Sequence, residues 1–273
     1  MALNLDVCYD FILPLIKKSG ELIRDRIWSQ KTVEVKASEI DLVTETDQEI
    51  ERILISSLRD KFPDHKFIGE ESTAAGQKCE LTAAPTWIID PVDGTMNFVH
   101  GYPNVCISVA LWADCVPEIG IIYAPVVGML FTARRGQGAF LNGNRIFASK
   151  QTDLAKALMG LEYGTTRNEQ HMKAVKENAN ILVPKVHGVR SSGSCAMNMA
   201  LTALGATDCN YEFGIHVWDI AAGMLIVTEA GGVVVDPAGG PVDVMSRRFL
   251  CASSQALADD VSRLLVQFYP ERD

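Results

Sequence analysis

The stretch that decides the fold is Trp87-Ile88-Ile89-Asp90-Pro91-Val92-Asp93-Gly94-Thr95-Met96-Asn97-Phe98. Its apolar start predicts a buried strand with Asp90 at its end, followed by a turn at the proline and the glycine. Asp93 and Thr95 then lie where a helix could begin. Two carboxylates three residues apart on a rigid turn can face one point, which suits a hard cation. The turn also aims free backbone N–H groups at an anion. An ordinary Asp-rich turn is the alternative for this stretch alone.

Other acidic residues also follow or precede apolar segments. Glu70 comes directly after a short apolar run, and Asp219 opens a very apolar predicted helix. Residues 41–47 place further acids, including Asp47, before another predicted helix. Taken alone, each of these acids is explained by a solvated loop or by helix capping.

Four of the acids are nevertheless expected to meet: Glu70, Asp90, Asp93 and Asp219. Each ends an apolar element, so a packed core would bring their carboxylates to one rim. There they would repel one another unless cations neutralised them. Two divalent ions balance the four charges formally. No His or Cys ligand spacing competes, so the pattern favours Mg2+ over zinc.

Apolar periodicity in the first half predicts two helices and then short strands. The first helix covers residues 5–28, where Pro14 is expected to kink it or to move its start. The second begins near Thr46, with residues 46–49 as a capping box. Residues 32–43 between them form a strand pair or a loop. From residue 86 onward the pattern predicts a β-meander with strands at 87–89, 105–112, 119–123 and 129–132.

The second half alternates between strands and helices. The pattern predicts helices at 195–204, 219–230 and about 254–268, and strands at 157–162, 186–189, 208–213, 233–235 and 249–252. Gly231-Gly232 has the form of a helix C-cap. We expect a layered α/β fold that forms a single catalytic unit over residues 1–273. Its N-terminal lobe would cover about 1–145 and its C-terminal lobe about 146–273.

Composition narrows the class of protein. The chain has 273 residues, 48% of them hydrophobic, and a formal net charge of -9, which argues against nucleic-acid binding. Its seven cysteines are scattered without a C-x-x-C pair, which indicates buried thiols in a reducing compartment. The N-terminus lacks a basic region, and no apolar run approaches membrane-spanning length. We therefore expect a cytoplasmic protein with no membrane partner.

Four motifs together resemble those of one known family. Residues 41–47, Gly69-Glu-Glu-Ser72, residues 87–98 and Trp218-Asp-Ile-Ala-Ala-Gly223 match, in order and spacing, the inositol monophosphatase family. This is the lithium-sensitive, Mg2+-dependent group that also contains fructose-1,6-bisphosphatases. The resemblance extends over nearly the whole chain and is closest to the animal enzymes. It implies a five-layer αβαβα sandwich, usually a homodimer, in which metal-activated water hydrolyses myo-inositol monophosphates to inositol and phosphate.

The resemblance also implies a role for individual residues. Two or three Mg2+ ions per subunit would be held by Glu70, Asp90, Asp93, Asp219 and the carbonyl of Val92. Thr95 with Asp47 would orient and deprotonate the attacking water, and Glu70 would share in the catalytic proton uptake. The remaining contacts, with phosphate or with the small phosphorylated polyol, would come from Lys36, Asp93, Gly94, Thr95, Thr165, Gly193, Ser194, Cys195, Glu212 and Asp219.

Two departures from the family pattern concern the substrate. Cys195 stands where small residues without sulfur are common, and Thr165 where Ser is frequent. The alternatives are a sibling phosphatase for a sugar phosphate, fructose 1,6-bisphosphate or a 3'-phosphoadenosine nucleotide, and a catalytically silent binding relative. His216, beside Trp218, is predicted to have a structural role rather than to act as a general acid.

Overall fold

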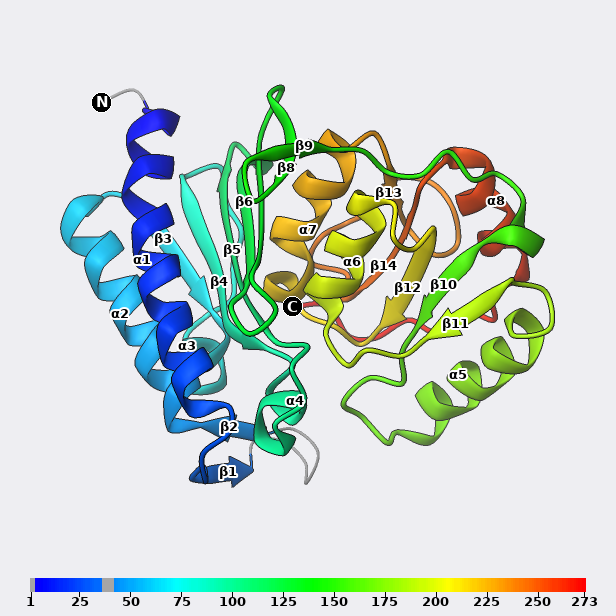
Figure 1. Cartoon of the computed structure of the whole chain (residues 1–273), viewed down its shortest axis with the longest axis horizontal. Coiled ribbons are helices and arrows are strands. Elements are labelled where there is room, and N and C mark those ends of the chain that lie inside the picture. Colours follow the sequence, from blue (N-terminus) through cyan, green and yellow to red (C-terminus); the bar gives the residue numbers. More distant parts are fainter. Residues whose placement is uncertain (1–2, 36–41) are drawn as a thin grey trace.

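The computed structural model describes residues 3–35 and 42–273. Figure 1 shows two sheets separating three layers of helices, which is the predicted αβαβα arrangement. The expected roles of Lys36 and of the acid at Asp41 lie outside the described residues. Among the described residues, no helix combines the length and apolar character that crossing a membrane requires.

The first sheet has seven strands in the order β3-β4-β5-β6-β7-β8-β9. These are β3 (Lys66–Gly69), β4 (Thr86–Asp93), β5 (Cys106–Ala113), β6 (Val116–Ala124), β7 (Met129–Arg134), β8 (Gly138–Leu141) and β9 (Asn144–Ile146). From β4 onward every pair is antiparallel, so the predicted meander is confirmed. Strand β3 joins β4 in parallel, which places the carboxyl ends of both strands at the same edge.

Two helices, α1 (Leu5–Arg26) and α2 (Glu45–Lys61), cover the outer face of this sheet. Their apolar sides pack against alternate residues of β4 and β5, such as Trp87, Ile89 and Val109. A small antiparallel pair, β1 (Val33–Val35) with β2 (Leu42–Thr44), precedes α2. Of the two alternatives predicted for this segment, a strand pair or a loop, the strand pair is the one observed.

The second sheet has five strands in the order β11-β10-β12-β14-β13. They are β10 (Leu158–Leu161), β11 (Gly188–Arg190), β12 (Cys209–Phe213), β13 (Val233–Val235) and β14 (Arg248–Ala252). A 3-10 turn, η1 (Leu154–Lys156), leads into the sheet. The outer face of this second sheet is covered by α5 (Glu169–Leu182) and α8 (Gln255–Leu264).

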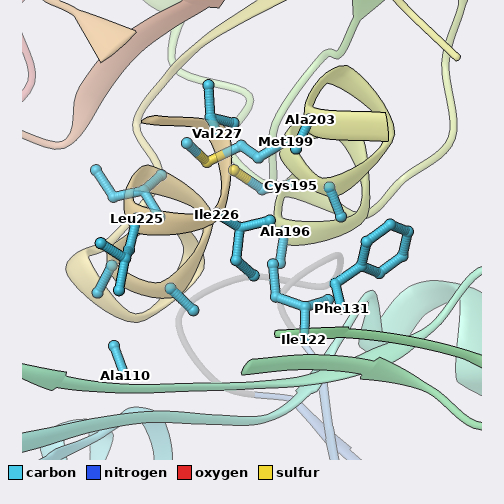
Figure 2. Packing of buried hydrophobic residues seen from close by; sticks show 14 of the residues in the cluster. Ala110, Ile122, Phe131, Cys195, Ala196, Met199, Ala203, Leu225, Ile226 and Val227 are labelled. Carbon is cyan, nitrogen blue, oxygen red and sulfur yellow. The ribbon is translucent and has the colours of Figure 1, made fainter. Parts of the chain in front are cut away.

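Helices α6 (Cys195–Leu204) and α7 (Val217–Glu229) fill the space between the two sheets. Figure 2 shows their side chains meeting those of the first sheet, among them Ala196, Met199, Leu225, Ile226, Ile122 and Phe131. A helix packed between two sheets is expected to be apolar on every side, and α7 is apolar from Ile220 to Val227. Gly120 of β6 permits the close approach, because a Cβ there would lie 2.7 Å from the Ala222 carbonyl oxygen.

Several predicted boundaries are wrong in informative ways. Helix α1 continues unbroken through Pro14 from Leu5, so the proline does not move its start. The N-cap of α2 is Thr44, not Thr46, and its capping box is completed by Asp47. Helix α8 ends at Leu264, short of the predicted residue 268. Two short helices, α3 (Glu70–Ala74) and α4 (Thr95–His100), follow β3 and β4.

Candidate active site

The acids predicted to meet do so at the carboxyl edge of β3 and β4. One carboxylate oxygen from each of Asp90, Asp93 and Asp219 lies within 4.8 Å of the other two. Asp219 reaches this point from the first turn of α7, which begins at Val217 rather than at Asp219 as predicted. Glu70, the first residue of α3, hydrogen-bonds Asp90 from the neighbouring strand end.

An irregularity in β4 brings two of these acids to one side. Residues three apart on a regular strand point to opposite faces. The pairing of β4 with β5 shifts between Asp90 and Asp93, so the strand continues through Asp93 instead of ending at Asp90 as predicted. The extra residue lets both side chains face the cluster. Gly94 follows with φ 90°, where a Cβ would lie 3.1 Å from the carbonyl oxygens of Asn104 and Gly193.

Burial and mutual repulsion make this cluster hard to ionise without a cation. Burial, followed by the charges of Glu70, Asp93 and Asp219, raises the pKa of Asp90. Burial raises the pKa of Asp93 to about 6, against hydrogen bonds from Ser194, Ala196 and Cys106 that lower it. Burial and then Asp93 raise the pKa of Asp219 to about 7. A set of converging carboxylates without His or Cys ligands fits a hard divalent cation.

Thr95 joins this cluster to a second buried acid. Its hydroxyl lies 3.1 Å from Oδ1 of Asp47 and 3.0 Å from the Val92 carbonyl oxygen. The other oxygen of Asp47 accepts hydrogen bonds from the Thr44 hydroxyl and, at 3.0 Å, from the Thr44 amide. The capping box of α2 therefore fixes Asp47 so that Oδ1 faces Thr95, as the predicted pairing of these two residues requires.

A pocket of about 800 Å³ opens over the cluster. Its lining includes Glu70, Asp90, Val92, Asp93, Gly94, Thr95, Thr165, Gly193, Ser194, Cys195, Glu212 and Asp219. Two predicted site residues are not among these: Lys36, which lies outside the described residues, and Asp47, which is buried behind Thr95. Both halves of the chain contribute acidic and hydroxyl groups to this lining.

Comparison with known proteins shows to which protein family the chain belongs. The model of the "Inositol monophosphatase family" matches residues 4–268. The chain belongs to the inositol monophosphatase family. It is 46% identical to human inositol monophosphatase 1, over 97% of this chain and 96% of the relative. It is 44% identical to mouse inositol monophosphatase 2, over 98% and 93% of the two chains. On this relationship the chain is a phosphoric monoester hydrolase.

The fold comparison agrees with the sequence comparison. The solved structure of the Thermotoga maritima IMPase superposes with a TM-score of 0.84 and 32% sequence identity. The match covers 93% of this chain and 95% of the other. The layered α/β fold of the inositol monophosphatase family is therefore the fold of this chain.

The pocket lining also includes a buried carboxylate outside this cluster, that of Glu212. Glu212 on β12 is 8% exposed, and its Oε2 has no hydrogen-bond partner among the described residues. Burial, followed by the charge of Glu162, raises the pKa of Glu212. Burial and then Glu212 raise the pKa of the adjacent Cys195 thiol, which keeps the thiol protonated.

Residues 191–194 form a loop that connects the two halves of the inositol monophosphatase fold at the pocket. Glu162 accepts hydrogen bonds from the amides of Ser192 and Gly193, at 2.6 and 3.1 Å. From the other side, the Asn97 side chain donates to the Ser192 carbonyl oxygen at 2.8 Å. Ser194 then donates to Asp93 at 2.6 Å. The loop is thereby held against the acidic cluster.

Three residues with a part in this site were not predicted from the sequence. Glu162 and Asn97 fix the loop just described. Glu51 of α2, 4% exposed, accepts hydrogen bonds from the amides of Glu71 and Ser72, each at 2.8 Å, and so holds the start of α3. Their partners are main-chain groups of distant segments. Only Asn97 lies in a recognisable motif, residues 87–98, and that motif does not indicate which groups its side chain binds.

His216 is the N-cap of α7, and both its ring nitrogens are engaged. Nδ1 lies 2.7 Å from a carboxylate oxygen of Asp273, and Nε2 lies 3.0 Å from a guanidinium nitrogen of Arg247. The ring also stacks on Trp218 at 4.5 Å between centroids. These contacts leave no ring nitrogen free to act as a general acid, so the predicted structural role of His216 is confirmed.

Proposed function

We propose that this chain is a Mg2+-dependent phosphatase that hydrolyses myo-inositol monophosphates to myo-inositol and phosphate. The observation that carries the proposal is the cluster of Asp90, Asp93 and Asp219 beside Glu70 in the lining of a pocket, with Asp90 and Asp93 buried and Asp219 half-buried. Such a cluster is costly in a stable protein unless cations occupy it. The names of the relatives, inositol monophosphatase 1 and 2, supply the substrate class.

The donors divide into overlapping sets for two or three Mg2+ ions. Glu70, Asp90 and the Val92 carbonyl would hold the first ion. Asp90, Asp93 and Asp219 would hold the second, and Glu70 would reach a weaker third position. Bound Mg2+ lowers the pKa of a coordinated water and stabilises the charge on the leaving alkoxide. A monovalent ion such as Li+ at the leaving-group position would hold the product and inhibit the enzyme.

Thr95 and Asp47 would orient the attacking water. When the Thr95 hydroxyl donates to Asp47, its lone pairs are left to accept a proton from water in the pocket. Asp47 stays in position because the amide and hydroxyl of Thr44 hold its other oxygen. The carboxylate of Glu70, next to Asp90, is the second group that can share the proton.

The phosphate would be held at the turn after Asp93. The amides of Gly94 and Thr95 open α4 at the pocket, where main-chain N–H groups can donate to non-bridging oxygens. We propose that Lys36 adds a positive charge to this position. Asp93 and Asp219 would contact the same end of the substrate through the ions that they hold.

The polyol would occupy the part of the pocket that Glu212 lines. The Glu212 oxygen that has no partner among the described residues can accept a hydrogen bond from a ring hydroxyl, whereas the phosphate dianion has no proton to donate. Further contacts are proposed for Thr165, Gly193, Ser194 and Cys195, which line the same pocket. The fixed loop at residues 191–194 supports this assignment, because a rigid wall selects a rigid ring.

The proposal also covers the domain organisation, the oligomeric state and the cellular location of the enzyme. We propose one catalytic unit, with lobes at about 1–145 and 146–273, in a cytoplasmic homodimer without nucleic-acid or membrane partners. The single unit is supported by Asp93 and Ser194, which join the two lobes at the site. The cytoplasm is supported by seven free cysteines, five of them buried.

The test is phosphate release from a panel of phosphomonoesters with Mg2+ and with EDTA. The panel contains myo-inositol 1-phosphate, glycerol 2-phosphate, fructose 1,6-bisphosphate and a 3'-phosphoadenosine nucleotide. We expect the highest kcat/KM for the inositol ester and no release in EDTA. A higher kcat/KM for another ester would make the chain a sibling phosphatase. No release from any of them would make it a silent relative.

A further inference from the structure

The chain after α8 returns to the active-site side of the molecule. Residues 265–273 run from α8 back toward α7, and Figure 1 places the end of the chain in the middle of the molecule beside α7. The path is fixed along its length. Arg248 of β14 donates to the Phe268 carbonyl oxygen at 2.6 Å, and the Asp273 amide donates to the Met245 carbonyl oxygen at 3.0 Å.

Asp273, the last residue of the sequence, inserts its side chain at the start of α7. The side chain is 5% exposed. One oxygen lies 2.7 Å from Nδ1 of His216, and the other accepts the Val217 amide at 2.9 Å. The guanidinium of Arg247 is 3.7 Å away. Val217 is the first residue of α7, so its N–H lacks a partner within the helix. This N–H lies at the positive end of the helix dipole, where a carboxylate is favoured.

The same turn holds a proposed metal ligand. The His216 amide donates to Oδ2 of Asp219 at 2.6 Å. Asp273 fixes the ring of His216 and the next amide, while Asp219 is held by the His216 amide itself. Trp218, stacked on the His216 ring, continues the pocket wall. Any shift of residues 216–217 would therefore move the Asp219 carboxylate relative to Asp90 and Asp93.

We propose that Asp273 is a positioning residue for the cation site: it fixes the first turn of α7 and, through it, the Asp219 carboxylate. The inference rests on the proposed metal-dependent function. It assigns to the chain end a part in cation affinity in addition to any part in anchoring the segment after α8. A side chain that only anchored the segment would affect stability and leave cation affinity unchanged.

The test compares Mg2+ binding in four full-length proteins by titration calorimetry without substrate. Asp273→Asn keeps the shape and removes the charge, whereas Asp273→Glu keeps the charge and changes the reach. Glu271→Gln removes a charge from an exposed residue of the same segment and is the matched control. We expect both Asp273 variants to bind Mg2+ about five- to twentyfold more weakly than wild type, the range for one charged hydrogen bond. Glu271→Gln should stay within about twofold of wild type.

A second readout separates positioning from catalysis. At saturating Mg2+, kcat of the Asp273 variants should return to within about threefold of wild type, because Asp273 touches no reacting atom. If both variants lower the melting temperature in EDTA but bind Mg2+ like wild type, Asp273 only anchors the segment and the inference is wrong. The inference is also wrong if Asp273→Glu binds Mg2+ as tightly as wild type and only Asp273→Asn binds it more weakly. A negative charge near the cation site would then explain the affinity without any positioning of α7.

Failure of the proposed function gives a different result. If wild type and Glu271→Gln bind no Mg2+, the proposal of a cation site is wrong, and the proposed role of Asp273 is then wrong as well. If one Asp273 variant does not fold, the other decides between positioning and anchoring by the same comparison with Glu271→Gln.

Discussion

The Thr95 hydroxyl has one proton and two acceptors, Asp47 at 3.1 Å and the Val92 carbonyl oxygen at 3.0 Å. This arrangement gives the hydroxyl two possible orientations. Donation to Asp47 turns its lone pairs toward the pocket, whereas donation to Val92 occupies a carbonyl that is a proposed metal ligand. A cation on that carbonyl would favour the Asp47 orientation, so cation binding and water activation are coupled at this residue.

We expect Thr95→Ala to lower kcat by about two to four orders of magnitude, the range for a lost acid–base element, while KM changes little. Thr95→Ser keeps the hydroxyl and is the matched control, with kcat within about tenfold of wild type. Steady-state kinetics on inositol 1-phosphate measure both. A normal kcat with a raised KM would instead make Thr95 an anchor for the phosphate.

Glu212 is expected to select the polyol. Loss of one charged hydrogen bond to a substrate hydroxyl costs about 1.5–3 kcal/mol, so Glu212→Gln should lower kcat/KM for inositol 1-phosphate roughly ten- to a hundredfold. Glycerol 2-phosphate, which lacks the ring, should be much less affected. Because burial already disfavours the Glu212 carboxylate, the melting temperature should not fall. An equal loss on both substrates would place Glu212 with the metal site or the fold instead.

The difference between predicted and missed residues at this scale has a physical reason. Asp90, Asp93 and Glu70 end or follow apolar runs, so their meeting could be expected from the sequence alone. Glu51 and Glu162 bind main-chain amides about 20 and 30 residues away. No local pattern encodes such contacts, since an acid can accept a hydrogen bond from any main-chain amide that the fold brings near it. Asp273 escaped prediction for the same reason.

At the scale of elements, the short helix α3 depends on its neighbour. It has five residues and no side-chain cap of its own, and such a helix is unstable in isolation. Glu51 of α2 supplies the cap by accepting two main-chain amides and the Ser72 hydroxyl. The position of Glu70 is therefore set by α2 as well as by β3.

Glu51→Gln should disturb this clamp, because an amide group presents a donor where two amides already donate. We expect the free energy of unfolding to fall by about 1–3 kcal/mol and the Mg2+ concentration for half-maximal activity to rise about fivefold. Glu49→Gln, which breaks a partly exposed pair with Arg26 on the same helix, should cost no more than about 1 kcal/mol. Denaturant titration and Mg2+ dependence measure the two effects. If Glu51→Gln and Glu49→Gln changed the free energy of unfolding and the Mg2+ dependence equally, Glu51 would not be the residue that holds α3 in place.

Most elements could be predicted where the apolar pattern was strong, as for α6, whose predicted range is the observed one. Helix α5 was missed because polar His171 and Asn178 interrupt its buried face. Its N-cap Asn168, which accepts the amides of residues 170 and 171, was an available signal. The hairpin of β8 and β9 was also missed, although Asn142-Gly143, both with positive φ, is typical of a tight hairpin turn.

At the scale of the whole molecule, the two lobes bring together a group of acids, of which Asp90 and Asp93 are buried and Asp219 is half-buried. In the metal-free protein the pKa of Asp219 is about 7, above its ordinary value of 3.8. Between these values the folded state binds a proton that the unfolded state does not. The free energy of unfolding should therefore fall as pH rises through this window. Asp90 and Asp93 act in the same direction.

We expect metal-free Asp219→Asn to melt at a higher temperature than wild type at pH 8, with the gap closing toward pH 5. The reason is that the variant lacks the carboxylate whose ionisation is unfavourable in the folded state. Thermal unfolding in EDTA from pH 5 to pH 8 measures the gap. Asp259→Asn, on the exposed side of α8, controls for the loss of a surface charge and should show no such trend. A gap that widened toward pH 5 would contradict the pKa shift.

The central claim is that the converging carboxylates hold the divalent ions on which hydrolysis depends. It is tested most directly by phosphate release from inositol 1-phosphate, titrated with Mg2+ after EDTA treatment, for wild type and Asp90→Asn. We expect wild type to be inactive without Mg2+ and to gain activity with it. Asp90→Asn should keep less than about a tenth of that activity at saturating Mg2+, because a shared ligand supplies several kcal/mol of charge stabilisation. Activity of wild type in EDTA, or near-normal activity of Asp90→Asn, would contradict the claim.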